Sequence, residues 1–179
     1  MTKWLIIDGY NLIHRTGAPS LRGVGVPHDL AGNRRHLIQL LEKTVGLLAE
    51  RITVVFDGRS GGAGHSSGDG HSSDMPDEQE SPVVEVLFSP RDKTADTVIE
   101  QLVFQAGPSG GIVVVTSDRL ERETAEGAGA ETMACSVFLD QLKETLERIE
   151  QELRSRGTDQ HSTTSLGNPF FKLDINKPG

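Results

Sequence analysis

The 179-residue sequence predicts an α/β fold built on a central, mostly parallel sheet of four to five strands. Short runs of β-branched and aliphatic residues alternate with stretches of helical periodicity, and several of the runs end at an aspartate. Strands that alternate with helices are joined by crossovers, which produce parallel sheets with helices on both faces. At roughly 150 residues per domain, the length predicts one domain. We place this domain at residues 1–156, with a C-terminal tail at residues 157–179.

The expected strands are short, apolar and rich in residues that favour β structure. They are residues 4–7, 52–56, 83–88 and 112–116, and a weaker strand near 131–134. The first two end in Asp-Gly and the fourth ends in Ser-Asp, all of which favour turns.

Four other stretches have apolar residues at helical spacing. We expect helices at residues 30–50, 95–106 and 119–127, and a long one that follows Ser136. Thr94 is the expected N-cap of the second, as Ser136 is of the last. The last helix has a narrow apolar stripe that is shorter than three heptads. A stripe this short favours packing of the helix on the sheet over a coiled-coil dimer, so we expect a monomer or a weak homodimer. The stripe consists of Leu139, Leu142, Leu146, Ile149 and Leu153.

Composition excludes several classes of protein. The chain has 18 basic and 26 acidic residues, a net charge of -8, so any contact with a polyanion must be local. An aromatic content of 4% argues against a platform on which bases stack. A single cysteine, Cys135, and the lack of a leader or a long apolar stretch favour a cytoplasmic protein without a membrane span.

Residues 59–82 interrupt the alternation of strands and helices. This segment has no apolar periodicity, contains the imperfect repeat GHSSGDGHSSD, and has one basic residue against five acidic ones. Such a composition predicts a flexible acidic insertion rich in Gly, Ser and His. The alternative is that His65 and His71 bind a soft transition metal, although no rigid frame surrounds them.

Acidic residues gather where the expected strands end. The carboxyl ends of parallel strands share one edge of a sheet, and Asp8, Asp57 and Asp118 follow three of the strands. Asp96 begins the helix after the third strand, and Glu100 lies one turn further on the same helical face. Each aspartate alone could be a turn former or an N-cap, and Glu100 could be a solvated surface residue.

Carboxylates held this close would repel one another unless a cation joined them. Mg²⁺ and Mn²⁺ prefer oxygen ligands, and two such ions about 3.5 to 4 Å apart can activate water and stabilise the leaving oxygen of a phosphodiester. This chemistry predicts a nuclease. Asn11 could orient Asp8 or hold a water molecule, or it could only form the turn in which it lies. Thr116 and Ser117 offer hydroxyls to a phosphate, or these hydroxyls could bond to nearby backbone groups instead.

Four segments together resemble one family. DGYNLI at residues 8–13, VVFDG at 54–58, KTADTVIEQL at 93–102 and VTSD at 115–118 look like the YacP-like branch of the NYN domains, within the PIN-like nuclease superfamily. The resemblance covers residues 3–156. It implies a PIN-like three-layer sandwich, metal-dependent RNA cleavage and, as in the characterised bacterial member, endonuclease action on mRNA at the ribosome.

The family's site residues carry over onto positions selected above. The resemblance implies a catalytic acidic site at Asp8, Asp57, Asp96 and Asp118, with Asn11 as its polar companion and Glu100 as an additional acidic residue. Our mechanistic hypothesis is that Asp8, Asp96 and Asp118, with Glu100, hold Mg²⁺ or Mn²⁺, and that Asp57 and Asn11 orient waters or ligands. The segment 59–82 departs from the pattern, because we expect a shorter and more basic connection there.

RNA also requires cations near this acidic edge. The basic residues that flank the expected site, together with the Ser117 hydroxyl, are the candidates for binding the substrate. The alternative is that these residues form an ordinary solvated surface of mixed charge. The candidates are Arg15, Arg91, Lys93, Ser117 and Arg119, and Arg22, Arg34, Arg35 and Arg122 are further cations near the same edge.

The favoured hypothesis is therefore a metal-dependent endoribonuclease that acts on RNA. A module that binds RNA or a ribosomal partner without cleavage is the alternative. A phosphoacceptor receiver domain also has clustered aspartates on a parallel sheet, but it needs an acidic pair after its first strand and a lysine after its last. This sequence has only Asp8 at the first of these positions and no lysine at the second.

Overall fold

The computed structural model describes residues 2–15, 30–58, 81–107 and 111–162. The chain divides into two units, residues 1–146 and residues 147–179. The first unit contains the whole sheet, and the described part of the second is helical. Most of the expected insertion, residues 59–80 with both of its histidines, lies outside the described residues, as does the tail from residue 163.

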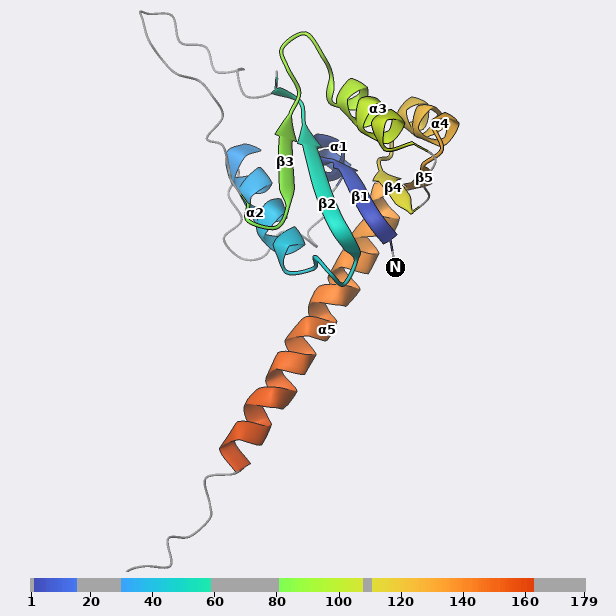
Figure 1. Ribbon diagram of the computed structural model, residues 1–179. Coiled ribbons are helices and arrows are strands. Elements are labelled where there is room, and N and C mark those ends of the chain that lie inside the picture. Colours follow the sequence, from blue (N-terminus) through green and yellow to red (C-terminus); the bar gives the residue numbers. More distant parts are fainter. Residues whose placement is uncertain (1, 16–29, 59–80, 108–110, 163–179) are drawn as a thin grey trace, which may run out of the picture. The chain divides into compact units, whose positions relative to one another are not determined.

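The first unit is built on a sheet of five parallel strands (Figure 1). The order across the sheet is β3-β2-β1-β4-β5, so β1 lies at the centre. Ile7 of β1 pairs with Val54 of β2 on one side and with Val115 of β4 on the other. The predicted α/β class and parallel sheet are confirmed. The strands are β1 (Thr2–Asp8), β2 (Ala49–Phe56), β3 (Glu85–Phe88), β4 (Ile112–Val115) and β5 (Glu131–Met133).

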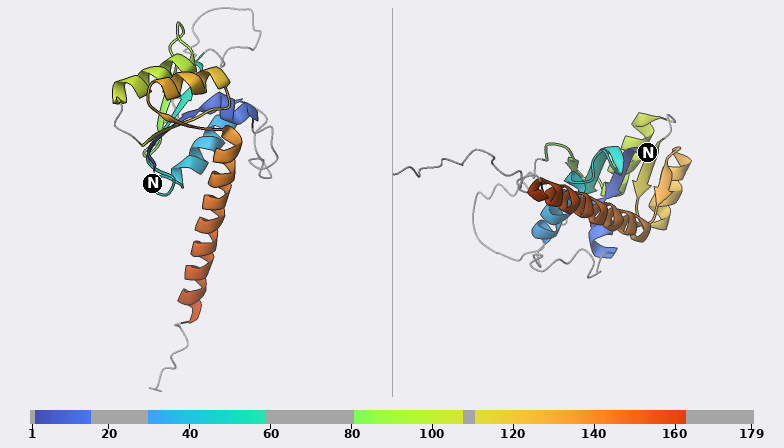
Figure 2. Two further views of the ribbon diagram at one scale, coloured as in Figure 1. Left: turned by 90° about the vertical axis from the view of Figure 1, so that its right-hand side faces the viewer. Right: turned by 90° about the horizontal axis from the view of Figure 1, so that it is seen from below.

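Helices cover both faces of this sheet (Figures 1 and 2). Side chains of α1, α2 and the first turns of α5 pack in one core, and those of α3 and α4 pack in a second core on the other face. The three-layer sandwich is therefore confirmed. The helices are α1 (Gly9–Arg15), α2 (Leu30–Glu42), α3 (Ala95–Ala106), α4 (Arg119–Gly127) and α5 (Cys135–Ser162).

The central strands are buried on both faces, which explains why they appear in the sequence as continuous apolar runs. Ile7 faces the core under α1, α2 and α5, whereas Ile6 faces the core under α3 and α4. In β2, Phe56 and Val55 divide between the two cores in the same way. Leu142, from the expected apolar stripe of the last helix, is fully buried in the first core.

Three local expectations were wrong. The last helix begins at Cys135, so Ser136 lies in its first turn and is not its N-cap. The helix expected at residues 30–50 ends at Glu42, because the Thr44 hydroxyl donates a hydrogen bond to the Leu41 carbonyl and Gly46 adopts a positive φ of 82°. Such a φ favours glycine and turns the chain into β2.

The turn expected after the first strand is the start of a helix instead. Helix α1 begins at Gly9, directly after β1. A Cβ at this position would lie 2.3 Å from Cε1 of Phe56, so only glycine lets α1 begin so close to the end of β2.

The strand order has its switch point between β1 and β4. From β1 the chain first adds β2 and β3 on one side, and it then crosses to add β4 and β5 on the other. At such a switch point the connections leave adjacent strands toward opposite faces, so a ligand can bind outside their carboxyl ends. Among the described residues, no helix is both long and apolar enough to cross a membrane.

Candidate active site

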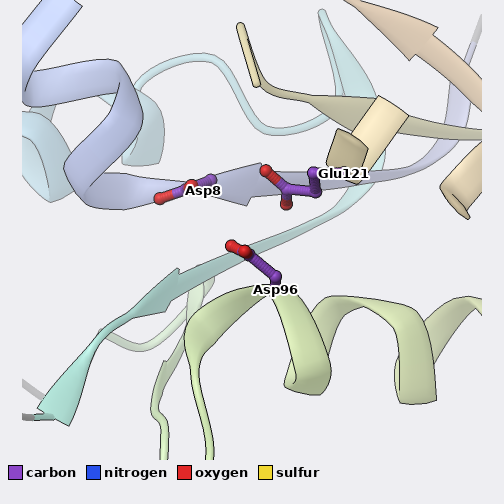
Figure 3. Close-up of side chains that lie close together, drawn as sticks. All are labelled: Asp8, Asp96 and Glu121. Atoms are coloured by element: carbon purple, nitrogen blue, oxygen red, sulfur yellow. The ribbon is translucent and has the colours of Figure 1, made fainter. Parts of the chain in front are cut away.

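Three carboxylates meet at the carboxyl ends of β1 and β4. Asp8 is the last residue of β1, Asp96 lies in the first turn of α3, and Glu121 lies in the first turn of α4. One carboxylate oxygen from each lies within 4.8 Å of the others. Figure 3 shows the three side chains close together, each from a separate element.

The N-caps of α3 and α4 position two of these side chains. Thr94 is the N-cap of α3, as predicted, and its side chain accepts a hydrogen bond of 3.3 Å from the amide of Thr97. Asp118 is the N-cap of α4 and accepts from the amides of Leu120 and Glu121 at 2.8 and 3.2 Å. Both helices therefore begin at the site, and their positive ends favour the acidic side chains of their first turns.

Asp8 is buried, and a hydrogen bond from helix α1, which follows it, fixes its side chain. The amide of Asn11 donates a 3.0 Å hydrogen bond to Asp8 Oδ1, which favours the charged form. Burial outweighs this bond and, together with the charges of Asp96 and Asp118, raises the pKa of Asp8 to about 6.

Glu121 is the most unusual member of the trio. Its side chain is only 5% exposed, and neither carboxylate oxygen has a hydrogen-bond partner of normal geometry among the described residues. Burial raises the pKa of Glu121 to about 8. The nearby Thr116 hydroxyl lowers the pKa, and the charges of Asp8, Asp96 and Asp118 raise it. A buried carboxylate without a partner is costly, so this group requires either a proton or a cation.

Asp96 gives the site an open side. Unlike its two neighbours it is exposed, and its pKa is raised by partial burial and then by the charge of Asp118. The donor set is thus three carboxylates, of which two are buried and one faces solvent. Oxygen donors, partial access to water and two orphaned buried oxygens fit a hard divalent cation.

The other predicted acidic residues lie around this trio. Asp57 accepts a 3.4 Å hydrogen bond from the Ser89 hydroxyl at the end of β3, and its charge raises the pKa of Asp96. Asp118 caps α4, and its charge raises the pKa values of all three carboxylates of the trio. Glu100 is exposed and lies one turn beyond Asp96 in α3, outside the trio.

Asn11 joins the elements that meet at the switch point. Its Oδ1 accepts hydrogen bonds from the Ser117 amide at 3.1 Å and from the Cys135 thiol at 3.3 Å. The Cys135 amide in turn donates to the Ser117 hydroxyl at 3.2 Å. Burial raises the pKa of the Cys135 thiol, which keeps it protonated and able to donate. Asn11 therefore fixes the end of β1 against the segment that follows β4 and against the start of α5.

The predicted substrate-binding cations have mixed surroundings. Arg119 is exposed and pairs with Glu123 at 2.8 Å, while Lys93 Nζ donates to Gln101 Oε1 at 3.2 Å. Both lie near the start of a helix that carries a carboxylate of the trio. Arg91 is exposed, and the side chain of Arg15, the last residue of α1, lies outside the described set.

Sequence reasoning missed Glu121. The signal was present in Asp118-Arg-Leu-Glu121, because an N-cap followed three residues later by Glu is the pattern of a capping box. In a capping box the Glu side chain reaches back to the N-cap amide. Here that amide instead donates to the Thr116 hydroxyl at 3.0 Å, and Glu121 turns toward Asp8 and Asp96.

A parallel sheet covered on both faces, with a carboxylate trio at its switch point, fits a nuclease-type domain of the PIN-like class. The chain belongs to the YacP-like NYN domain family, whose model matches residues 5–168.

Two solved structures are similar to most of the chain. A crystal structure of Rae1 (YacP) from Bacillus subtilis is 28% identical, with a TM-score of 0.68, over 89% of this chain and 84% of that one. A crystal structure of a mutant form of the same Bacillus subtilis protein is 27% identical, with a TM-score of 0.65, over 92% and 87% of the two chains. No curated protein matches the chain.

Proposed function

We propose that this protein is an endoribonuclease that requires Mg²⁺ or Mn²⁺ to hydrolyse phosphodiester bonds in RNA. The observation that carries the proposal is the convergence of Asp8, Asp96 and Glu121 within 4.8 Å, with both oxygens of the buried Glu121 unpartnered among the described residues. Family membership supports a nuclease that acts on RNA.

The three carboxylates would hold the ion. Asp8 and Glu121 provide buried oxygens from two elements, and Asp96 provides an exposed one from a third. A bound divalent ion supplies a Lewis acid, which makes water acidic near neutral pH and stabilises negative charge on a phosphate.

The surrounding residues have supporting roles in this proposal. Asn11 keeps Asp8 in place through its amide and the contacts of its side chain with Ser117 and Cys135. Asp57 and Asp118 add negative charge, which strengthens the attraction for a cation, and Glu100 is an additional acidic group on the solvent side. Lys93 and Arg119 flank the trio and can attract the RNA backbone.

The family resemblance also implies a cytoplasmic protein that reaches mRNA at the ribosome, and we include this in the proposal. It can be tested separately from the chemistry: an mRNA should be cleaved faster during translation than when it is free. Equal rates would remove the ribosome as a partner and leave the nuclease proposal intact.

The test of the chemistry is cleavage of a labelled single-stranded RNA in EDTA, Mg²⁺ and Mn²⁺. Cleavage should require the ion, and its rate should fall by about 100-fold or more in Asp96→Asn. Loss of a residue that only supports a metal ligand lowers metal affinity or activity by about 10- to 100-fold, and loss of a ligand itself should cost at least as much. Asp96 is exposed, so this change should not unfold the protein.

Asp140→Asn, an equivalent change at an exposed position of α5, is the matched control and should retain full activity. RNA binding without metal-dependent cleavage would instead support a non-catalytic RNA-binding module.

A further inference from the structure

An arginine lies against aromatic rings at the same edge of the sheet as the carboxylates. The guanidinium carbon of Arg34 is 5.6 Å from the centroid of the Phe88 ring and 6.0 Å from that of Phe56. Its Nη1 donates a 2.7 Å hydrogen bond to the Tyr10 hydroxyl. Phe56 and Phe88 are the last residues of β2 and β3, so the guanidinium is held at the carboxyl ends of these strands.

These aromatic contacts make the guanidinium a fixed group. The Tyr10 ring packs edge-on against Phe56 with centroids 5.2 Å apart, and Phe56 stacks with Phe88 at 5.6 Å. Phe56 is fully buried and Tyr10 is 7% exposed, so the surface beneath the arginine is rigid. A guanidinium held in one orientation loses little conformational entropy when it binds a ligand.

Arg34 lacks an acidic partner among the described residues, in contrast to a similar arginine elsewhere. Arg51 also stacks on an aromatic ring, with its guanidinium carbon 3.9 Å from the Trp4 centroid, but it forms a 2.8 Å ion pair with Glu85. Within the described part of the chain, Arg34 bonds to the Tyr10 hydroxyl and to no carboxylate. Arg34 is half-buried and has no counter-charge among the described residues, which suggests an anion from outside.

The arginine is connected to the carboxylate trio through short stretches of chain. Tyr10, its hydrogen-bond partner, is two residues after Asp8, and the Phe56 ring lies directly against Gly9. Asp8 faces the layer of α3 and α4, where Asp96 and Glu121 lie, whereas Arg34 belongs to α2 on the other face. A strand of RNA that crosses this edge of the sheet would therefore meet both groups.

We infer that Arg34 is a phosphate-binding residue that holds the RNA backbone on the α2 side of the carboxylate trio. The inference rests on the proposed function. The forked donors of a guanidinium match the oxygens of a phosphate, and Nη1 is already engaged by Tyr10. Nε and Nη2 form no hydrogen bond with the part of the chain that the structure describes, and they can bind the ligand. Arg34 thus adds a binding residue from a helix outside the sequence motifs that define the acidic site.

The test measures RNA binding as a function of salt in the full-length Asp96→Asn protein, where the RNA remains intact. One phosphate contact to a single strand contributes about 0.7 to the slope of log affinity against log salt. Arg34→Gln should lower the slope by about this amount and should weaken binding to all RNA sequences alike. Arg51→Gln, the matched control, should leave both slope and affinity unchanged.

Arg34→Lys keeps the charge but loses the fork, so the slope should persist while affinity falls about five-fold, the net contribution of one hydrogen bond. This variant also serves if Arg34→Gln does not fold, because unchanged affinity in Arg34→Lys would overturn the inference. An unchanged slope in folded Arg34→Gln would overturn it as well and leave the proposed function standing. If the wild-type protein neither binds nor cleaves RNA, the proposed function fails, and the inference fails with it.

Discussion

Replacing Glu121 with glutamine should make the metal-free protein more stable at neutral and alkaline pH. In the folded protein the pKa of Glu121 is about 8, against an ordinary value of 4.5. Between these two values the folded chain retains a proton that the unfolded chain has released. The free energy of unfolding therefore falls as pH rises through this range and becomes constant above about pH 8.

The size of the effect follows from the shift in pKa. At about 1.4 kcal/mol for each factor of ten in acidity, a pKa raised from 4.5 to about 8 corresponds to at most about 5 kcal/mol of lost stability above pH 8. A glutamine has nearly the same shape and never ionises, so Glu121→Gln should remove this loss. Its buried amide still lacks partners, which lowers stability by about 1–3 kcal/mol at every pH.

The measurement is urea unfolding in EDTA at pH 5, 6.5 and 8. The difference in unfolding free energy between Glu121→Gln and wild type should shift in favour of the variant as pH rises. Asp8, with a pKa of about 6, contributes in the same direction between about pH 4 and 6 in both proteins and so cancels. Glu144→Gln, which alters an exposed glutamate of α5, should follow the wild type at every pH.

Adding Mn²⁺ or Mg²⁺ should reduce the stability advantage of Glu121→Gln over the wild type. An ion at 100 times its dissociation constant stabilises a protein by about 3 kcal/mol, and the variant should lose most of this gain. Parallel pH curves for the two proteins in EDTA would refute the assignment of Glu121 as a buried, unpartnered acid. Equal stabilisation by the ion would refute its role as a ligand.

Two further predictions concern the site and the start of α1. Affinity for Mn²⁺ should rise with pH up to about 8, because Asp8, with a pKa of about 6, and Glu121, with a pKa of about 8, must lose protons to bind it. Calorimetry in two buffers at pH 7 should show release of about one proton per ion, and a pH-independent affinity would contradict the assigned ligands. Gly9→Ala should destabilise the fold by about 1–3 kcal/mol, because the added Cβ would lie 2.3 Å from the Phe56 ring. An unchanged midpoint of thermal unfolding would contradict this and would show that the ring moves away without cost.

Much of the fold could be predicted from the sequence because several local signals agreed. The buried strands are short apolar runs, and Asp-Gly after the first two located the edge at which Asp8 and Asp57 lie. Thr94 marked the start of α3 correctly. The fold class, the parallel order and the layers all follow from the alternation of such elements.

The remaining features depend on tertiary contacts. The apolar spacing of residues 45–48 continues that of α2, yet Gly46 and the start of β2 at Ala49 end the helix earlier. The direction of the Glu121 side chain depends on the competition between a capping bond and the carboxylate trio, which sequence spacing does not reveal. Arg34 likewise became distinctive only when its aromatic neighbours and its lack of an acidic partner among the described residues were known.

The three carboxylates belong to β1, α3 and α4, so their repulsion acts between elements that are far apart along the chain. A shared ion would act as a reversible noncovalent cross-link between the central strand and the two helices of one layer. The concentration of divalent cations would then control how firmly α3 and α4 are held on the sheet as well as the rate of cleavage. Nuclease activity and local rigidity would rise and fall together.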